Sequence, residues 1–355
     1  MERFFQSFMI DGNVLIILFI CLQFDMITLG IETSCDETAV GILDDDTILA
    51  NIVSSQVAHT KFGGVVPELA ARNHIKVVVP LTKLALEVAH RDLSDVDLIS
   101  VTRGPGLIGA LLVGLSYAKS LAIALDRPFV AVNHLEGHIY ALHLDRGLQY
   151  PYLVLLASGG HTEVVLVKDE FSYETLGRTT DDACGEAFDK VAKIIGFPYP
   201  GGPYIENAAK SGVLGVIDFP VPKPKGLTFS YAGLKTAVLY FTRDNPDYKR
   251  DDIAANFQEV AIEHLIQVVR KAIVSTKVRQ LGIVGGVSAN KRLREKFQGL
   301  ASDMGIMLHI PELQYCTDNG IMIALTGACR YVKYGSSDLS IDAVAREPLD
   351  DIPTV

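Results

Sequence analysis

The chain has 355 residues, 49% of them hydrophobic and 21% charged, which fits a folded protein with enough residues for two domain cores. Its formal net charge of −10 argues against a dedicated binder of polyanions. The five cysteines are scattered without any Cys-x-x-Cys pair, which excludes a cysteine-rich zinc knuckle and argues against a disulfide framework. We therefore expect a reducing compartment and a cytoplasmic location.

Residues 1–25 differ in character from the rest of the chain. The apolar run Val14–Leu22 is shorter than the roughly 20 residues that span a bilayer, and no small-residue cleavage site follows it. We expect residues 1–25 to be an N-terminal extension that is not part of the fold, with Met26 as the working start. We expect no association with a membrane.

The pattern from Met26 to residue 149 predicts an α/β domain. Short apolar runs bounded by polar turns indicate strands, and longer segments with helical periodicity indicate helices. The expected elements are, in chain order, the strands Ile27–Ile31, Thr38–Leu43 and Ile48–Ser55, the helix Val65–His90, the strand Leu98–Thr102, the helix Leu107–Leu125 and the strand Phe129–Val132.

The same order of elements returns in residues 150–355. Both halves open with a strand, a polar turn and two further strands, the turns being Glu32–Glu37 and Ser158–Gly160. We therefore predict two related α/β domains, residues 26–149 and residues 150–355, the second with a helical insertion. The expected elements of the second half are the strands Tyr152–Ala157, His161–Lys168 and Phe171–Arg178, the helix Asp182–Ile195, a turn at Gly201–Pro203, a loop at Lys223–Leu234, the helix Asp251–Lys277, the strand Leu281–Val284 and the helices Lys291–Met304 and Ile321–Tyr334.

A pair of histidines follows the strand that ends at Val132. In a helix, His134 and His138 lie one above the other, so that both imidazoles can hold one metal ion. The alternative is two histidines that face solvent. A zinc protease is disfavoured, because its general base comes directly after the first ligand. The glutamate here is third, at Glu136, and points roughly 200° away from His134.

Positive charge is concentrated in residues 221–300, which hold 14 Lys and Arg against 7 Asp and Glu. Any contact with nucleic acid is therefore expected in this segment, the alternative being an ordinary mixed surface. Four of these cations lie in the predicted helix Lys291–Met304, namely Lys291, Arg292, Arg294 and Lys296.

Seven short motifs occur along the chain, and together they resemble the TsaD family, the tRNA N6-adenosine threonylcarbamoyltransferases, formerly misnamed glycoproteases. The motifs are Gly30–Thr38 (GIETSCDET), Asn133–His138 (NHLEGH), Ser158–Thr162 (SGGHT), Asp181–Lys190 (DDACGEAFDK), Tyr199–Gly202 (YPGG), Gly285–Asn290 (GGVSAN) and Cys316–Asn319 (CTDN). The resemblance extends from about Met26 to Arg346. Archaeal and eukaryotic members of the family have a tyrosine ligand where Leu156 stands, so the likeness is to the bacterial branch.

The resemblance implies an actin-like, sugar-kinase-like and heat-shock-ATPase-like fold, with two ribonuclease-H-like domains around a central cleft. It also implies an enzyme that transfers the threonylcarbamoyl group of threonylcarbamoyl-adenylate to N6 of adenosine 37 in tRNAs reading codons that begin with A, with release of AMP. The partners that it implies are tRNA, a TsaB-like paralogue and a TsaE-like ATPase.

A metal site and an adenylate site are further implications of the resemblance. His134, His138 and Asp318 match the metal ligands of the family, and the expected ion is one Fe²⁺ or Zn²⁺ per chain, which two imidazoles and a carboxylate suit. The positions that match adenylate-binding residues are Leu156, Ala157, Ser158, Gly159, Gly160, Asp189, Gly202 and Asn290. Since Asn290 precedes the basic helix, we expect that helix to contact tRNA phosphates.

The sequence leaves the catalytic base open. Glu37 is the candidate, because its turn in the first domain faces the expected cleft, and the alternative is a solvated turn carboxylate. One rival function is a kinase of the same fold acting on a small substrate, which leaves the histidine pair unexplained. The other is a non-catalytic scaffold subunit, which the loss of metal ligands would mark.

Overall fold

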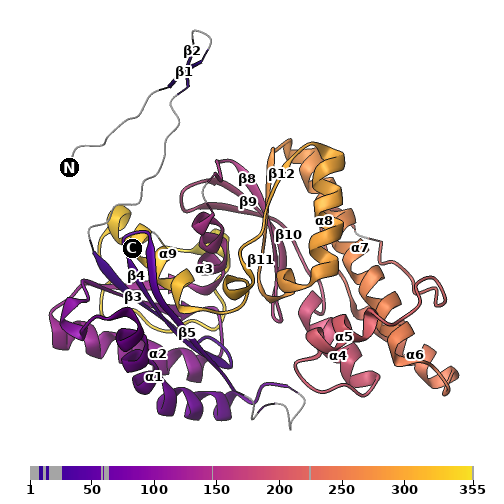
Figure 1. Ribbon diagram of the computed structural model, residues 1–355, viewed down its shortest axis with the longest axis horizontal. Helices are drawn as coiled ribbons and strands as arrows, with labels where there is room; N and C mark the ends of the chain where they lie inside the picture. Colours follow the sequence, from indigo (N-terminus) through magenta and orange to yellow (C-terminus); the bar gives the residue numbers. More distant parts are fainter. Residues whose placement is uncertain are drawn as a thin grey trace.

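The computed structural model describes residues 8–10, 13–15, 26–56, 59, 64–145, 147–223 and 225–353. Ahead of Met26, β1 (Phe8–Ile10) and β2 (Asn13–Leu15) pair antiparallel in a two-stranded sheet of their own (Figure 1). These two short strands were not expected from the sequence. That residues 1–25 are not part of the fold stays a prediction.

The first five-stranded sheet is built from β3 (Ile27–Glu32), β4 (Glu37–Asp44), β5 (Thr47–Ser55), β6 (Leu98–Gly104) and β7 (Phe129–Asn133). Its order is β5-β4-β3-β6-β7. β4 runs antiparallel to β3 and β5, whereas β6 and β7 continue the sheet in parallel to β3. The central strands β3 and β6 are buried along almost their whole length, as their continuous apolar runs indicate.

The second five-stranded sheet is built from β8 (Tyr152–Ala157), β9 (Thr162–Asp169), β10 (Ser172–Arg178), β11 (Gln280–Val284) and β12 (Met307–His309). Its order, β10-β9-β8-β11-β12, repeats that of the first sheet, with the same parallel and antiparallel pairings. The repeated strand pattern and the α/β class predicted from the sequence are confirmed. The domain boundary between residues 149 and 150 stays a prediction.

Helices α1 (Pro67–Ala89) and α2 (Ile108–Leu125) cover one face of the first sheet (Figure 1). Small side chains such as Ala118 let α2 pack closely on strand residues such as Val101, in one apolar core. Within the part of the chain that the structure describes, α2 is the helix whose length and apolar composition would suffice to cross a membrane. Its contacts with β6 and α1 are those of a helix in a domain core.

Helices α3 (His134–Tyr140) and α9 (Gly320–Tyr334) lie on the opposite face of the first sheet (Figure 1). Ile323 of α9 packs with apolar residues of β6 and β7. Leu135 of α3 packs with Leu156 of β8 in a separate core. Helix α3 therefore lies between the two sheets, and the chain returns from the second sheet to the first to form α9.

The remaining helices belong to the second sheet, and they are α4 (Cys184–Ile194), α5 (Gly201–Ala209), α6 (Ala232–Asp244), α7 (Arg250–Thr276) and α8 (Lys291–Met304). They share one large apolar core with the inner strands. Short 3-10 helices lie at Leu93–Asp95, Ala141–Leu144, Gly286–Ala289, Leu313–Tyr315 and Leu349–Asp351.

Some elements of the second half differ from the sequence prediction. The expected turn at Gly201–Pro203 is the first turn of α5, where a proline needs no backbone N–H donor. Helix α6 begins at Ala232, inside the expected loop Lys223–Leu234, and continues beyond it. Strand β12 was not predicted, because a three-residue edge strand carries little local signal and pairs with β11 only in the folded chain.

Candidate metal centre

The histidine pair lies on α3, directly after β7. Asn133 caps this helix, since its side-chain oxygen accepts hydrogen bonds from the backbone N–H groups of Leu135 and Glu136. His134 and His138 are 8% and 1% exposed, and their rings meet edge to face with centroids 4.8 Å apart. The alternative of two solvent-facing histidines is therefore wrong.

Asp318 reaches the histidines because α9 approaches the first sheet very closely. A side chain on Gly30 or Gly41 would collide with the backbone of Gly320, the first residue of α9. Three glycines at this crossing thus let the helix N-terminus touch β3 and β4. Asn319 caps α9 through its side-chain oxygen, and Asp318 directly precedes this cap.

The two imidazoles and the carboxylate direct their ligand atoms to one point. Oδ1 of Asp318 lies 3.2 Å from Nε2 of His138 and 3.6 Å from Nε2 of His134, and the three ligand atoms all lie within 4.8 Å of one another. Ligand atoms about 2.1 Å from a tetrahedral metal ion are roughly 3.4 Å apart. The three side chains therefore fit one divalent metal ion.

Glu32, which sequence reasoning did not single out, holds His134 in place. It is fully buried at the end of β3, and its Oε2 lies 3.0 Å from Nδ1 of His134. The hydroxyl of Thr102 and the backbone N–H of Ser34 donate to the same carboxylate. A carboxylate on one ring nitrogen fixes the imidazole and leaves the other nitrogen for a metal. The signal in the sequence was an acidic residue at the end of a buried apolar strand.

Charges within the site influence one another strongly. Burial disfavours the charged form of His134, but the carboxylates of Asp318 and Glu32 outweigh this and raise its pKa to about 9. Burial also disfavours the ionised form of Asp318, yet the imidazoles of His134 and His138 lower its pKa to about 2. Asp318 is therefore ionised at neutral pH, as a metal ligand must be.

The turn Ser158–Gly160 follows β8 and carries three of the predicted adenylate positions. It is tightly packed from behind, since a side chain on Gly185 would collide with the turn and one on Gly285 with Ala157. The two glycines inside the turn have open space around them. The backbone of the turn is therefore accessible, whereas Leu156 and Ala157 are fully buried in the strand that carries it.

Asp189 and Asn290, two further predicted adenylate positions, already have protein partners. Asp189 accepts a hydrogen bond of 2.6 Å from the backbone N–H of Gly201, at the start of α5. Asn290 caps α8, and its amide nitrogen donates to Gln258 at 2.7 Å. Both side chains therefore support a helix N-terminus, while Gly202 beside them faces open space.

Glu37 opens β4 on the first-domain side of the site. Its carboxylate accepts a hydrogen bond of 2.8 Å from the hydroxyl of Ser55. Burial and the negative charge of Asp318 raise the pKa of Glu37 to about 8. Burial and the charge of Asp36 likewise raise the pKa of Tyr199, which precedes α5. The negative charges of the turn that carries Glu37 therefore act on Tyr199 in the second half of the chain.

His161 is a second site residue that sequence reasoning missed, although it stands in the motif SGGHT. Burial, together with the positive charges of His134 and His138, lowers its pKa to about 4. Its imidazole is therefore neutral at pH 7 and close to the metal triad. The motif itself was the signal that could have found it.

Most cations of the basic helix α8 contact neighbouring groups of the protein. Arg292 and Lys296 both form ion pairs with Glu259 of α7. Arg294 donates to two backbone carbonyl groups and points toward the protein. Three of the four cations of this helix are thus held by contacts within the protein, which weakens the expectation that the helix, with Lys291, contacts tRNA phosphates.

Fold and site together define a protein of two ribonuclease-H-like α/β units with a candidate His-His-Asp metal centre where they meet. A model of the family described as TsaD, tRNA N6-adenosine threonylcarbamoyltransferase, matches residues 47–325. A protein of that name from Thermosipho africanus is 50% identical over 325 residues, which are 90% of this chain and 98% of the relative. One from Salinibacter ruber is 47% identical over 328 residues, 89% of this chain and 98% of the relative.

Among solved structures, HypF from T. kodakarensis superposes with a TM-score of 0.57 at 15% identity, over 91% of this chain and 51% of that one, which is a likeness of fold. The chain belongs to the TsaD family, the tRNA N6-adenosine threonylcarbamoyltransferases. It is a transferase of tRNA modification, and its fold is the actin-like, sugar-kinase-like fold that the motifs indicated.

Proposed function

We propose that this chain transfers the threonylcarbamoyl group of threonylcarbamoyl-adenylate to N6 of adenosine 37 in tRNAs that read codons beginning with A. The single observation that carries the proposal is the convergence of His134, His138 and Asp318 from two distant parts of the chain. Membership of the family supports the reaction, since relatives about half identical over almost their whole length bear the transferase name.

The reaction is acyl transfer to an amine. The lone pair of N6 attacks the carbamoyl carbon, the bond from that carbon to the phosphate oxygen breaks, AMP leaves, and N6 loses one proton. The adenine amine is a poor nucleophile because its lone pair is delocalised into the ring. The main tasks of the protein are therefore to position both substrates and to stabilise developing negative charge.

His134, His138 and Asp318 would hold one divalent ion, for which we propose Fe²⁺ or Zn²⁺. Nitrogen and carboxylate ligands suit both metals. When bound, the ion supplies Lewis-acid chemistry toward a phosphate or carbamoyl oxygen. Leu156 is fully buried and has no ligand atom, so three protein ligands leave coordination positions open, as in catalytic metal sites.

We propose that the adenylate binds at the accessible turn Ser158–Gly160, where the backbone N–H groups of Gly159 and Gly160 can donate to its oxygens, and beside Gly202, which has open space around it. Leu156 and Ala157 form the end of the strand that carries this turn. Asp189 and Asn290 act by holding the N-termini of α5 and α8. The open space around the glycines of both segments supports this assignment.

Glu37 is the proposed acceptor of the N6 proton. A base is most effective when its pKa lies near the working pH, and the pKa of Glu37 is raised to about 8. The negative charge of Asp318 contributes to this rise in the pKa of Glu37. Replacement of Glu37 by Gln is expected to lower the transfer rate while leaving metal content unchanged.

We further propose that the chain works in the cytoplasm with tRNA, a TsaB-like paralogue and a TsaE-like ATPase. Exposed apolar side chains on neighbouring helices support a protein partner: Ile75 and Val79 of α1 are 62% and 41% exposed, and Leu112 of α2 is 45% exposed. Gly109 of α2 lies against Ala71 of α1, so the two helices share one surface.

The experiment that tests the proposal is incubation with synthetic threonylcarbamoyl-adenylate and unmodified tRNA, alone and with the two partners, followed by nucleoside analysis. We expect threonylcarbamoyladenosine in tRNAs with adenosine at position 37 and none in tRNAs without it. ATP-dependent phosphorylation of a small hydroxylated substrate, without any transfer, would favour the kinase. A scaffold role would show as equal transfer by the partners without this chain.

A further inference from the structure

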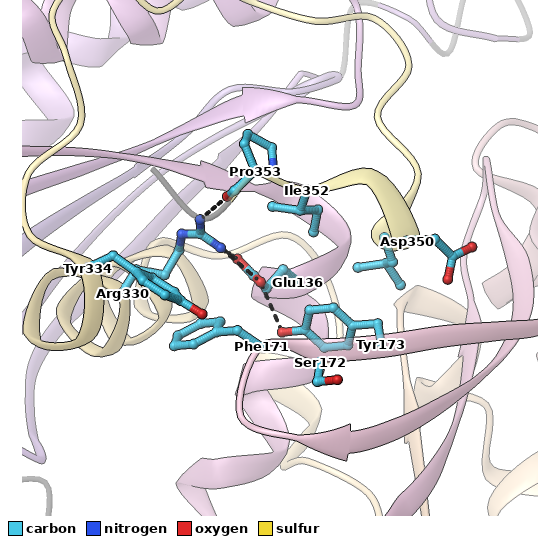
Figure 2. A pocket seen from close by; sticks show the side chains of 10 residues that line it. Glu136, Phe171, Ser172, Tyr173, Arg330, Tyr334, Asp350, Ile352 and Pro353 are labelled. Atoms are coloured by element: carbon cyan, nitrogen blue, oxygen red, sulfur yellow. Dashed lines mark hydrogen bonds and ion pairs between the residues drawn. The ribbon is translucent and has the colours of Figure 1, made fainter.

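An ion pair between Glu136 and Arg330 lies behind the metal triad, on the other side of α3. Glu136 stands between the two histidines in sequence, but its side chain points roughly 200° away from His134 around the helix axis. Glu136 is fully buried, and Arg330 of α9 is 7% exposed. Nη1 of Arg330 donates to both carboxylate oxygens, at 3.1 and 3.2 Å (Figure 2).

The same pair is contacted by the second sheet and by the C-terminal segment. The hydroxyl of Tyr173 in β10 donates to Oε1 of Glu136 at 2.9 Å (Figure 2). Nη2 of Arg330 donates to the carbonyl of Pro353, and the guanidinium lies 5.3 Å from the ring centre of Phe171. A cavity of about 220 Å³ adjoins these side chains. Four segments far apart in sequence thus meet at one buried pair.

Two of these segments are the ones that carry the metal ligands. Helix α3 holds both histidines, and α9 begins two residues after Asp318. The helices pack closely, since a side chain on Gly137 would collide with Ile323 of α9. The separation between the histidines and Asp318 therefore depends on how α3 is seated against α9.

An apolar contact alone would allow these helices some freedom to slide, because burial of apolar surface has no direction. A buried charge without its partner is strongly unfavourable, so the pair favours the one register in which Glu136 meets Arg330. Tyr173 links the position of Glu136 to the second sheet, because its hydroxyl reaches Glu136 only while β10 keeps its position.

We propose that Glu136 and Arg330 are positioning residues for the metal centre. They hold α3 and α9 in the register that brings His134 and His138 to Asp318, and Tyr173 couples this register to the second sheet. The inference rests on the proposed metal site. Neither member of the pair reaches the metal ligands, so their effect is exerted through the two helices.

The test compares Co²⁺ binding by the full-length wild-type chain with that of Arg330→Lys and Glu136→Gln. Lysine keeps the charge of Arg330 but lacks the planar group that donates to Glu136 and Pro353 together. Glutamine keeps the size of Glu136 and loses its charge. We expect the Co²⁺ dissociation constant to rise roughly 3- to 30-fold in each variant. The Co²⁺ absorption spectrum, which reports ligand geometry, is expected to change as well.

The matched control is Val269→Ala in α7, which creates a cavity in the second core, remote from α3 and α9. A pair that only stabilised the fold would affect Co²⁺ binding no more than this control at equal loss of thermal stability. Weaker binding and an altered spectrum in the two pair variants, with wild-type values in Val269→Ala, would support the positioning role.

Tyr173→Phe keeps the inference testable if a pair variant does not fold. It removes one hydrogen bond to Glu136 and is expected to weaken Co²⁺ binding by a smaller factor in the same direction. Wild-type affinity and spectrum in the folded pair variants, or in Tyr173→Phe where those do not fold, would overturn the positioning role. A wild-type chain that binds no Co²⁺ would overturn the proposed metal site itself, and this inference with it.

Discussion

The carboxylate of Glu32 lies 3.0 Å from Nδ1 of His134, while Nε2 of the same ring faces Oδ1 of Asp318 at 3.6 Å. Glu32 thus decides which ring nitrogen is free for a metal. Its other contacts, from Thr102 and from the backbone of Ser34, keep the carboxylate from turning away. The metal site therefore depends on a strand that contributes no ligand.

Replacement of Glu32 by Gln is expected to weaken metal binding about 10- to 100-fold, because the ring of His134 loses its charged acceptor. The variant should remain folded, since glutamine has the same shape. Competition with a chromophoric chelator measures the affinity. Glu163→Gln in β9, another largely buried glutamate, is the control and should bind as the wild type does. Wild-type affinity in the Glu32 variant would show that His134 needs no such support.

A chain that begins at Met26 is expected to fold and to work as the full chain does. Met26 is 9% exposed, and the backbone N–H of Ile27 donates to Asp97 at 3.0 Å, so the first strand of the five-stranded sheet keeps its contacts in this shorter chain. A chain that begins at Gly30, inside β3, is the control and should not fold. Thermal unfolding and solubility check both, and an insoluble Met26 chain beside a soluble full-length chain would contradict the expectation.

The stability of the chain is expected to fall on acidification because of His143. Burial and the nearby charge of His309 lower the pKa of His143 to about 4, against 6.5 for the unfolded side chain. Between these values the unfolded chain binds more protons, so the free energy of unfolding falls as the pH is lowered from about 6.5 to 4. His143→Gln should show a shallower fall, measured by urea unfolding at several pH values. An equal dependence of the free energy of unfolding on pH in both chains would contradict the role of His143.

Neutralising Arg292 and Lys296 together is expected to leave the salt dependence of tRNA binding unchanged. Their two charges are already paired with Glu259, Glu263 and Glu295, so they release few counterions from tRNA. The loss in stability should be about 1 kcal/mol or less, as for other partly exposed ion pairs. Titrations of tRNA over a salt series compare the double glutamine variant with the wild type. A flatter slope would restore α8 as a tRNA contact.

Local sequence patterns were sufficient for most of the fold and for the histidine pair, whereas Asp318 was expected only from the resemblance to the family. The spacing of His134 and His138 places both on one face of any helix, and the strand runs repeat in the same order in both halves. The supporting residues were beyond such reasoning, because their partners are distant in sequence. Glu32 lies 102 residues from His134, and Glu136 lies 194 residues from Arg330.

The charge of α8 is a second example of contacts that the sequence pattern does not predict. Counting residues predicted a basic segment. The count does not show which acidic side chains of α7 form ion pairs with the cations of α8. The side chain of Asn290 is likewise used within the protein, as a helix cap. A sequence pattern identifies the residue types at a site, and the folded contacts decide which of their atoms remain available.

The central claim is that His134, His138 and Asp318 form one metal site at which transfer occurs. The most direct test measures metal content and threonylcarbamoyladenosine formation in the same preparations of wild type, Asp318→Ala and the control His309→Gln, each verified as folded by circular dichroism. The account predicts one metal ion per chain and full transfer in the wild type and the control, and neither in Asp318→Ala. Full metal occupancy together with wild-type transfer in Asp318→Ala would contradict it.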